Sequence, residues 1–276
     1  MLTKVEVRNR QGDSLMMPFE DFDSGLGVAE IEGLDPTKAT LVSSGFAGQD
    51  GAQYYNSKRE PRNLKLKIEL IPDFVNTSVR SLRQQLYRFL MPKTEVTLRF
   101  YEDLGSYVDV VGRVEEFKAP LFTDDPVADI SLMCFDPDFF DPNPFTVNGL
   151  TVIGSDVTMT TIPYLGTVET GFLFTLELDR NINAFSIVHQ VPSGFTYQLE
   201  FAETLLAGDR VLISTIAGSK GASLTRSSVV SSLLWGVSPL SKWLELEGPG
   251  DNLIRVSSSA AGIPWNIQYV TRHGGL

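Results

Sequence analysis

Ser14 is the first residue whose neighbours suggest chemistry. It lies in the string Gly12-Asp13-Ser14-Leu15, which is found around the nucleophile of some esterases. A serine nucleophile needs a histidine as general base and an acid that orients the histidine. The histidines are His189 and His273, and neither has an aspartate three residues before it. We therefore expect no catalytic site at Ser14 and interpret this string as an exposed turn.

Metal and cofactor sites are not predicted either. Zinc sites need several cysteine or histidine ligands at short spacings, and the chain has one cysteine, Cys134, and widely separated histidines. The aspartate clusters do not follow the spacing of a calcium-binding loop; they are Asp21/Asp23, Asp124/Asp125 and Asp136/Asp138/Asp141. Two pairs of glutamates could flank a glycosidic bond, but such pairs on strands are too common to indicate glycoside hydrolysis. These pairs are Glu115/Glu116 and Glu245/Glu247.

Three tryptophans leave one binding function open. Trp235, Trp243 and Trp265 would form a platform for stacking sugars if they shared a surface. Tryptophans in protein cores or interfaces are the more common case. Sugar binding is therefore kept as an alternative.

Composition favours an ordinary folded protein of two domains. The chain has 276 residues, of which 42% are hydrophobic and 21% charged. The net charge is −11, and both halves are acidic, so general binding to nucleic acid is disfavoured. We expect Cys134 to be a buried, inert thiol. Without an apolar signal sequence or a run of 18 apolar residues, we expect synthesis in a reducing cytoplasm and no membrane span.

The first domain, residues 1–140, is predicted to be α+β. The segment Leu64–Leu70 alternates apolar and charged residues, which is typical of a half-buried strand. One helix is predicted near residues 77–91, capped by Asn76 or Thr77 and stopped by Pro92. The region 11–63 contains many turn residues and is interpreted as a long loop that contacts a partner.

The second domain, residues 141–276, is predicted to be an all-β sandwich, because short alternating runs are separated by turns. The segment Cys134–Phe145 joins the two domains and combines three prolines with four phenylalanines. Proline restricts the backbone, and buried phenylalanine would anchor it, so we interpret this segment as a stiff hinge. The candidate hinge residues are Phe135, Pro137, Phe139, Phe140, Pro142 and Pro144.

In this order, the motifs resemble the distal tail protein family of siphophages. In the first domain the resemblance covers the turn Gly48–Gly51, Arg62 with the following LKLKIEL, the Arg-x-x-Leu helix ending at Met91-Pro92, VTLRF, VVGRVEEF, and the closing run Ile130–Phe140. In the second domain it covers Gly166–Leu178, Gly208–Thr215 and Trp243–Ile254.

This resemblance implies a structural virion protein and no enzyme. Members of the family have a ring-forming first domain and a galectin-like β-sandwich. The resemblance implies a homo-hexameric ring at the distal end of the tail, with stacking of rings left open. The ring would join the tail tube protein and the tape-measure protein to the tail-tip hub, fibre or receptor-binding proteins of the baseplate. DNA would only pass through its channel. The alternative is a lectin-like module that binds host cell-wall carbohydrate through the second domain.

A closed ring needs two different patches on each subunit. We expect the segment from Gly45 to Arg62 and the edge strands of the first domain to supply one patch, by strand addition or loop exchange with the next subunit. The arginines on the other face of the helix either form a solvated surface or make salt bridges to acidic loops of a neighbouring subunit. The candidate interface residues are Asp50, Gly51, Tyr54, Tyr55, Arg59, Arg62, Arg80 and Arg83.

Overall fold

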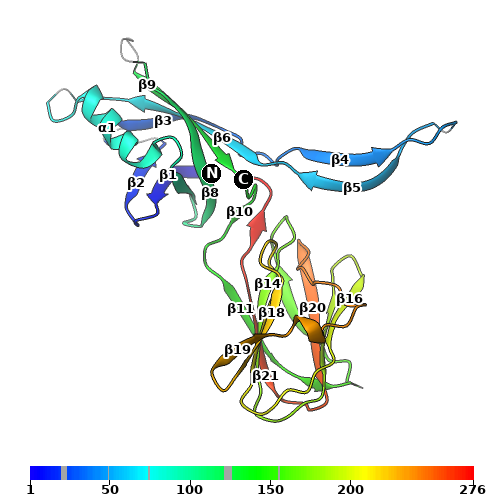
Figure 1. The fold of residues 1–276 in the computed structure, drawn as a ribbon. Helices are drawn as coiled ribbons and strands as arrows, with labels where there is room; N and C mark the ends of the chain where they lie inside the picture. Colours follow the sequence, from blue (N-terminus) through cyan, green and yellow to red (C-terminus); the bar gives the residue numbers. More distant parts are fainter. Residues whose placement is uncertain (20–23, 49, 74, 121–125, 155) are drawn as a thin grey trace. The chain divides into compact units, whose positions relative to one another are not determined.

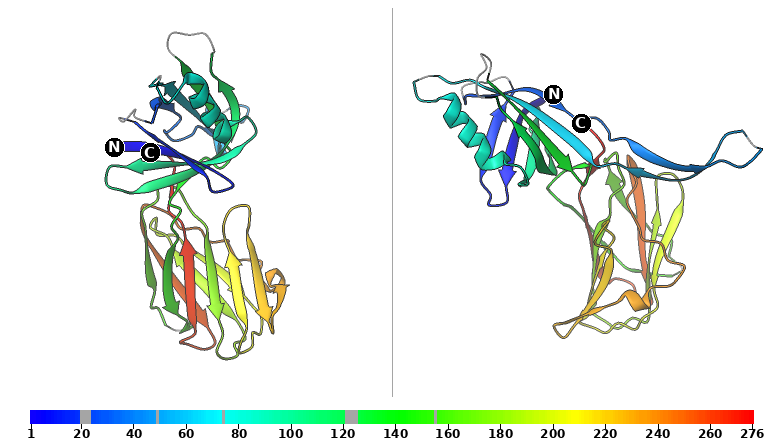
Figure 2. Two further views of the ribbon diagram at one scale, coloured as in Figure 1. Left: turned by 90° about the vertical axis from the view of Figure 1, so that its left-hand side faces the viewer. Right: turned by 45° about the horizontal axis from the view of Figure 1, so that its top comes forward.

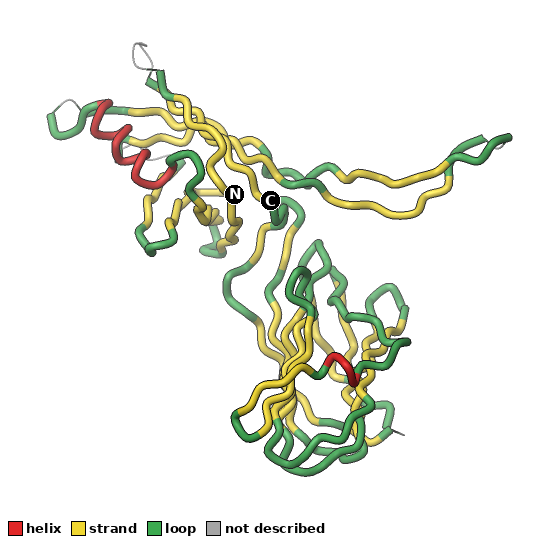
Figure 3. The backbone as a smooth tube through the Cα atoms, in the orientation of Figure 1, coloured by secondary structure: helices red, strands yellow, loops and turns green. Residues whose placement is uncertain are grey.

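The chain folds into two compact units. The computed structural model describes residues 1–19, 24–48, 50–73, 75–120, 126–154 and 156–276. Unit 1 is Met1–Asp141 together with His273–Leu276, and unit 2 is Pro142–Arg272. Strands make up 53% of the chain, and the described residues contain a single α-helix. Figure 3 shows that strands, drawn in yellow, form most of both units. The prediction of a mainly β chain with one clear helix is confirmed.

Unit 1 is built on a nine-stranded sheet. Its main path runs in the order β2-β1-β7-β8-β9-β6-β3, with β10 and β22 paired off this path (Figure 1). The strands are β1 (Leu2–Asn9), β2 (Ser14–Pro18), β3 (Leu26–Glu32), β6 (Arg62–Leu70), β7 (Glu95–Glu102), β8 (Tyr107–Lys118), β9 (Val127–Cys134), β10 (Phe139–Phe140) and β22 (Arg272–His273). The last residues of the chain, 273–276, also belong to unit 1, which a single boundary at residue 140 does not provide for.

Strand β6 shows why this sheet has one core face. Alternate side chains from Arg62 to Leu70 are buried, and those between them are exposed. Successive side chains of a strand point to opposite faces, so the leucines and Ile68 enter the core while Lys65 and Lys67 face solvent. This agrees with the predicted alternation. Cys134 at the end of β9 is buried, and burial raises the pKa of its thiol to about 12.

Helix α1 (Val79–Leu90) places one apolar stripe on this core. Leu82, Leu86, Phe89 and Leu90 are buried, as their helical spacing predicts. The N-cap is Ser78, and the expected caps Asn76 and Thr77 are wrong. Their backbone N–H groups instead donate to the carboxylate of Asp73, at 2.8 and 2.7 Å.

The region 11–63 is not one long loop. It contains β2 and β3 of the sheet, followed by the hairpin strands β4 (Ala39–Ser44) and β5 (Gln53–Arg59). These last two form a separate two-stranded sheet that leaves the nine-stranded sheet as an extended hairpin (Figures 1 and 2). We call residues 39–59 the arm.

Unit 2 consists of two sheets around one core. The first sheet has the order β11-β21-β14-β17-β18-β19, and the second has β12-β20-β15-β16, with β13 paired to β20. Its elements are β11 (Phe145–Leu150), β12 (Val152–Ile153), β13 (Thr160–Tyr164), β14 (Phe172–Glu177), β15 (Phe185–Gln190), β16 (Thr196–Phe201), β17 (Arg210–Ser214), β18 (Gly221–Arg226), β19 (Val229–Ser232), the 3-10 helix η1 (Leu234–Gly236), β20 (Gly250–Ser258) and β21 (Pro264–Tyr269).

Aromatic side chains from both sheets fill this core. Phe174 on β14 and Phe185 on β15 stack with ring centroids 6.5 Å apart, and Phe185 stacks on Phe201 at 4.7 Å. Because residues of the two sheets belong to one buried cluster, unit 2 is a β-sandwich. None of the helices in the described parts of the chain is long and apolar enough to cross a membrane.

Candidate assembly interface

The arm is the most unusual feature of unit 1, because it has no core of its own. Strands β4 and β5 pair antiparallel, from Ala39 opposite Arg59 to Ser44 opposite Gln53. Every residue of β4 is exposed, and in β5 only Arg59 is partly covered. A two-stranded hairpin is marginally stable in water when no further surface covers it. The arm therefore has the properties of an element that is completed by another surface.

Apolar side chains on the arm support this interpretation. Leu41 is 66% exposed and Tyr54 59% exposed, and Tyr55, Phe46 and Val42 are all more than half exposed. Clustered exposed apolar groups mark interaction sites more often than scattered ones do. Tyr54 and Tyr55 were predicted interface residues, whereas Leu41, Val42 and Phe46 were missed. An exposed strand has no buried face, so no alternation marked β4.

The tip of the arm follows from its glycines. Gly48 and Gly51 adopt φ values of +84° and +91°, a left-handed region that favours glycine. The predicted residues Asp50 and Gly51 lie in this exposed connection between β4 and β5. Near the tip, the Tyr54 hydroxyl donates to Ser57 Oγ at 2.8 Å. Tyr54 is thereby held along the arm and remains accessible.

The base of the arm is tied to unit 1 by an ion pair. Arg59, the last residue of β5, donates both terminal nitrogens to the carboxylate of Asp138, which is itself buried. A bidentate arginine–carboxylate pair of this kind fixes the relative orientation of the two side chains as well as stabilising their contact. The predicted interface residue Arg59 thus has a partner within its own unit.

Arg62 must be removed from the candidate interface. Its side chain is 1% exposed and lies in the interior of unit 1. Its guanidinium donates to four backbone carbonyls from three distant segments, those of Gly33, Asp35, Pro137 and Gly274. Burial lowers its pKa from the ordinary value. A second subunit cannot reach this side chain, and its role is to hold unit 1 together.

Among the described residues, no hydrogen bond or ion pair joins the helix arginines to the arm. Arg80 is exposed on α1, and Arg83 is half-buried and donates to the Tyr87 hydroxyl at 2.8 Å. The neighbouring Arg88 pairs with Asp13 of the β1–β2 turn at 2.9 Å. Of the two predicted interface arginines of this helix, Arg80 therefore presents the more accessible charge.

The candidate hinge residues differ widely in burial. Phe139 is fully buried in the core of unit 1, whereas Phe135 is 69% exposed. Phe140, Pro137 and Pro142 are half-buried, and Pro144 is exposed. The expectation that the phenylalanines of this segment are locked into cores is wrong for Phe135 and for Phe145, which is 47% exposed. Phe139 belongs to unit 1.

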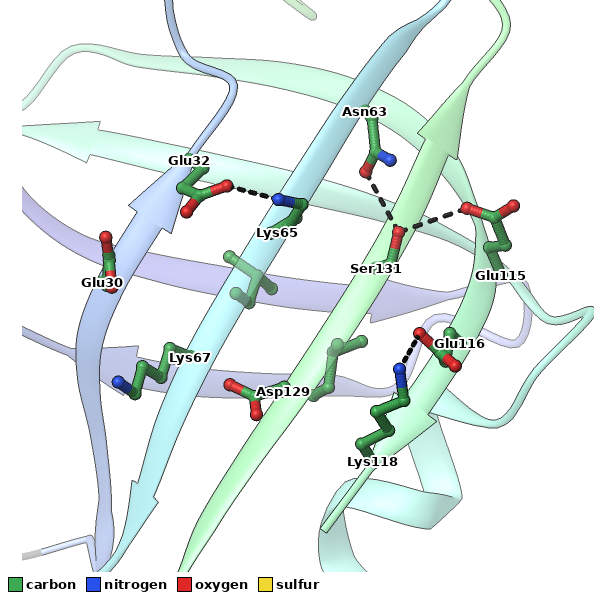
Figure 4. Close-up of a pocket in the computed structure, with 12 residues that line it drawn as sticks. Glu30, Glu32, Asn63, Lys65, Lys67, Glu115, Glu116, Lys118, Asp129 and Ser131 are labelled. Atoms are coloured by element: carbon green, nitrogen blue, oxygen red, sulfur yellow. Dashed lines mark hydrogen bonds and ion pairs between the residues drawn. The ribbon is translucent and has the colours of Figure 1, made fainter.

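A polar hollow of about 720 Å³ lies on the outer face of the nine-stranded sheet (Figure 4). Charges alternate across its strands, because Glu30 on β3 is opposite Lys67 on β6, Lys67 is opposite Asp129 on β9, and Asp129 is opposite Lys118 on β8. Lys65 pairs with Glu32 and Lys118 with Glu116, each at 2.7 Å. Such cross-strand pairs stabilise a sheet. Ser131 donates to Glu115 at 3.2 Å and to Asn63 at 3.0 Å, and the described lining contains no histidine that could serve as its general base.

The catalytic and sugar-binding candidates are not assembled. Ser14 begins strand β2 and is not in a turn, and in the described residues neither histidine hydrogen-bonds to it. Trp265 is 3% exposed in the core of unit 2, whereas Trp235 is 70% exposed. The tryptophans therefore do not form one stacking platform. Among the residues that the structure describes, no cluster of potential metal ligands occurs, and Asp21, Asp23, Asp124 and Asp125 lie outside them.

Comparison with known proteins points to phage tails. Residues 28–125, which include the whole arm, match the family model of the phage tail protein RIFT-related domain. No curated protein matches the chain. The crystal structure of the Dit (gp 19.1) protein of phage SPP1, described as a paradigm of the hub adsorption apparatus in phages that infect Gram-positive bacteria, is similar with a TM-score of 0.65 and 14% identity. That similarity covers 97% of this chain and 98% of the SPP1 chain.

Two structures of the activated phage P2 baseplate, with Ca and with Sr, are similar at TM-scores of 0.45 and 0.43 and 11% identity, each over 97% of this chain and 98% of the other. The resemblance predicted from the sequence motifs is confirmed by the family model and by the SPP1 fold. Residues 28–125 therefore match the phage tail protein RIFT-related domain, and the fold of the chain is similar to that of the SPP1 Dit protein.

Proposed function

We propose that the chain is a structural subunit of a siphophage tail that assembles into a homo-hexameric ring at the distal end. The ring joins the tail tube and the tape-measure protein to the hub, fibre or receptor-binding proteins of the tip, and DNA leaves through its centre. The observation that carries this proposal is the arm. It lies inside the segment that matches the phage tail family, and its exposed apolar residues need a partner surface.

Ring formation follows from the properties of such an element. A subunit that gives an arm to one neighbour and receives an arm from another makes a head-to-tail contact, and such contacts close into a ring when the rotation permits. The net charge of −11 suits a channel through which DNA passes without binding, because like charges repel. We assign no catalytic step to the protein, which acts by connecting other components.

Light scattering combined with negative-stain imaging of the purified chain tests the proposal. A discrete ring of six subunits at micromolar concentration is the expected result. A monomer at every concentration up to about 100 μM would contradict ring formation by this chain alone. Glycan-array binding by such a monomer would favour the lectin-like alternative, which has little support because Trp265 lies in the core.

A further inference from the structure

A pocket of about 400 Å³ lies at one end of the nine-stranded sheet, and no residue of the arm lines it. Three segments of unit 1 each bring a cation to this pocket: the β1–β2 turn brings Arg10, the connection from α1 to β7 brings Lys93, and β8 brings Arg113. Arg88, in the last turn of α1, adds a fourth. Four cations thus surround one small volume in a chain whose net charge is −11.

Glu95 holds two of these cations in place. Its Oε1 accepts from Arg10 Nη2 at 2.6 Å, and its Oε2 accepts from Arg113 Nη2 at 2.8 Å. The hydrogen bond from Arg10 lowers the pKa of Glu95, so the carboxylate stays ionised at neutral pH. The side chains of Arg10 and Arg113 are nevertheless 72% and 51% exposed. Because a guanidinium has five donors, both arginines keep N–H groups for a further acceptor.

Lys93 gives the pocket an excess of positive charge. Among the described residues Lys93 forms no ion pair, whereas Arg88 pairs with Asp13 at 2.9 Å. The four cations therefore share two carboxylates, those of Glu95 and Asp13, and two positive charges are left over. A local excess of one sign in a hollow attracts groups of the opposite charge.

The backbone of Lys93 has a conformation that lysine rarely adopts. Its φ is +75°, in the left-handed region that favours glycine. The Lys93 N–H donates to the Val114 carbonyl at 2.8 Å, and the Val114 N–H donates to the Thr94 carbonyl at 2.9 Å, so β8 fixes this turn. Strained residues of this kind cluster at functional sites, where the surrounding structure keeps a side chain in place. Glycine would relieve the strain here but would lack the ammonium group.

A carboxylate is the anion that suits this pocket best. Glu95 and Asp13 show that its arginines already bind carboxylates. Binding to nucleic acid draws on many cations repeated along a face, whereas here the cations form one compact group in an acidic chain. The charge of the pocket therefore favours an acidic peptide over a phosphate backbone.

We propose that this pocket binds the carboxylate side chains of an acidic segment from a different protein of the tail. Lys93 and the remaining donors of Arg10 and Arg113 hold the incoming carboxylates, and Glu95 keeps the two arginines in position. The inference goes beyond the proposed ring and does not depend on it, because a single subunit carries all the lining residues of the pocket.

Fluorescence anisotropy with labelled octaglutamate tests this pocket on the full chain. We expect the wild type to bind with a dissociation constant below about 100 μM at low salt, and to bind more weakly as salt screens the attraction. Lys93→Gln should weaken binding by at least about fivefold. The matched control is Lys67→Gln, which removes the same charge from an exposed position of β6 outside the pocket. It should change the affinity by less than about twofold.

Lys93→Gly separates binding from folding. Glycine adopts a positive φ without strain, so the melting temperature of this variant should equal or exceed that of the wild type. Its affinity for octaglutamate should fall as it does in Lys93→Gln, because both variants lack the ammonium group. Wild-type affinity in either variant would overturn the role of Lys93.

Two further measurements decide the occupant. An oligothymidylate of equal charge should bind less tightly than octaglutamate, and tighter binding would overturn the protein partner in favour of nucleic acid. Lys93→Gln should leave the concentration needed for ring assembly unchanged within about twofold, because the occupant is a different protein. A weakened ring would identify a second copy of this chain as the occupant and overturn the assignment.

The binding results also stand apart from the proposed function. No octaglutamate binding by the wild type, or equal losses in Lys93→Gln and Lys67→Gln, would overturn the pocket and leave the ring untouched. A wild-type chain that binds octaglutamate through Lys93 but never assembles would overturn the ring and leave the pocket.

Discussion

The guanidinium carbon of Arg62 lies 4.3 Å from the centroid of the Phe139 ring, so a buried cation stacks on a buried aromatic side chain in unit 1. The same guanidinium reaches backbone carbonyls of three other parts of the chain. Arginine suits this place because its planar fork has five donors and stacks on rings. Arg62, the first residue of β6, thereby connects the segment 33–35, Pro137 and the segment 273–276.

Replacing Arg62 should destabilise unit 1 strongly. Arg62→Met leaves buried carbonyls without donors, at a cost of roughly 3 kcal/mol or more in the free energy of unfolding. Arg62→Lys keeps the charge but loses the planar fork, so an intermediate loss is expected. Urea unfolding measures both, with the exposed Arg80→Met as control. Equal stability of Arg62→Met and the control would show that the carbonyls find other donors.

The two phenylalanines of the connecting segment should respond differently to truncation. Phe139→Ala removes a fully buried ring and should cost about 3–5 kcal/mol in the stability of unit 1. Phe135→Ala alters a side chain that is 69% exposed and should cost less than about 0.5 kcal/mol. Thermal unfolding of the two variants side by side provides the measurement. Similar losses for both would mean that Phe135 is covered in solution.

The arm should matter for assembly and not for folding. Leu41→Ser combined with Tyr54→Ser removes two exposed apolar groups, so the melting temperature of the dissociated subunit should stay within about 2 °C of wild type. Anchoring side chains in interfaces are typically worth more than about 1 kcal/mol each, so the assembly midpoint should shift by at least about tenfold. Analytical ultracentrifugation over a concentration series measures this. Leu104→Ser is the control, and an equal shift in both variants would argue against a role for the arm.

His189 should make the stability of unit 2 depend on pH. Its ring is fully buried on β15, and its Nε2 lies 2.9 Å from Asn252 Oδ1. Burial lowers the pKa of His189 in the folded state, so below about pH 6.5 the unfolded chain binds more protons than the folded chain. The free energy of unfolding therefore decreases as the pH falls from about 6.5, by no more than about 1.4 kcal/mol per pH unit.

Urea unfolding of wild type at several pH values between 7.5 and 5, compared with His189→Gln, checks this dependence. The variant should lose the slope in this interval, whereas His273→Gln should keep it. A slope that persists in His189→Gln would assign the effect to another group.

Regular, half-buried elements could be predicted from the sequence, and elements defined by distant partners could not. The alternation of Leu64–Leu70 and the apolar stripe of α1 identify β6 and the helix, because each has one buried face. The cap is Ser78, whose hydroxyl accepts from the Ser81 N–H, whereas the side chains of Asn76 and Thr77 are engaged with Asp73. The arm has no buried face, so its strands were taken for a loop.

Arg62 was placed in the candidate interface for a related reason. A basic residue next to exposed arm residues is indistinguishable in sequence from a surface charge. Its acceptors come from Gly33, Asp35, Pro137 and Gly274, and only the folded chain brings them together. Tyr54 and Tyr55 were predicted interface residues, and the structure places both exposed on the arm, where this prediction stays open to test.

The return of His273–Leu276 to unit 1 makes unit 2 an insertion with both of its ends attached to the same body. The Leu276 N–H donates to the Leu34 carbonyl at 3.1 Å, and Arg62 donates to the Gly274 carbonyl, so hydrogen bonds fasten this segment to unit 1. The core residues of the two units form separate clusters. During evolution the segment Pro142–Arg272 can therefore be replaced by another domain, while unit 1 keeps its own fold.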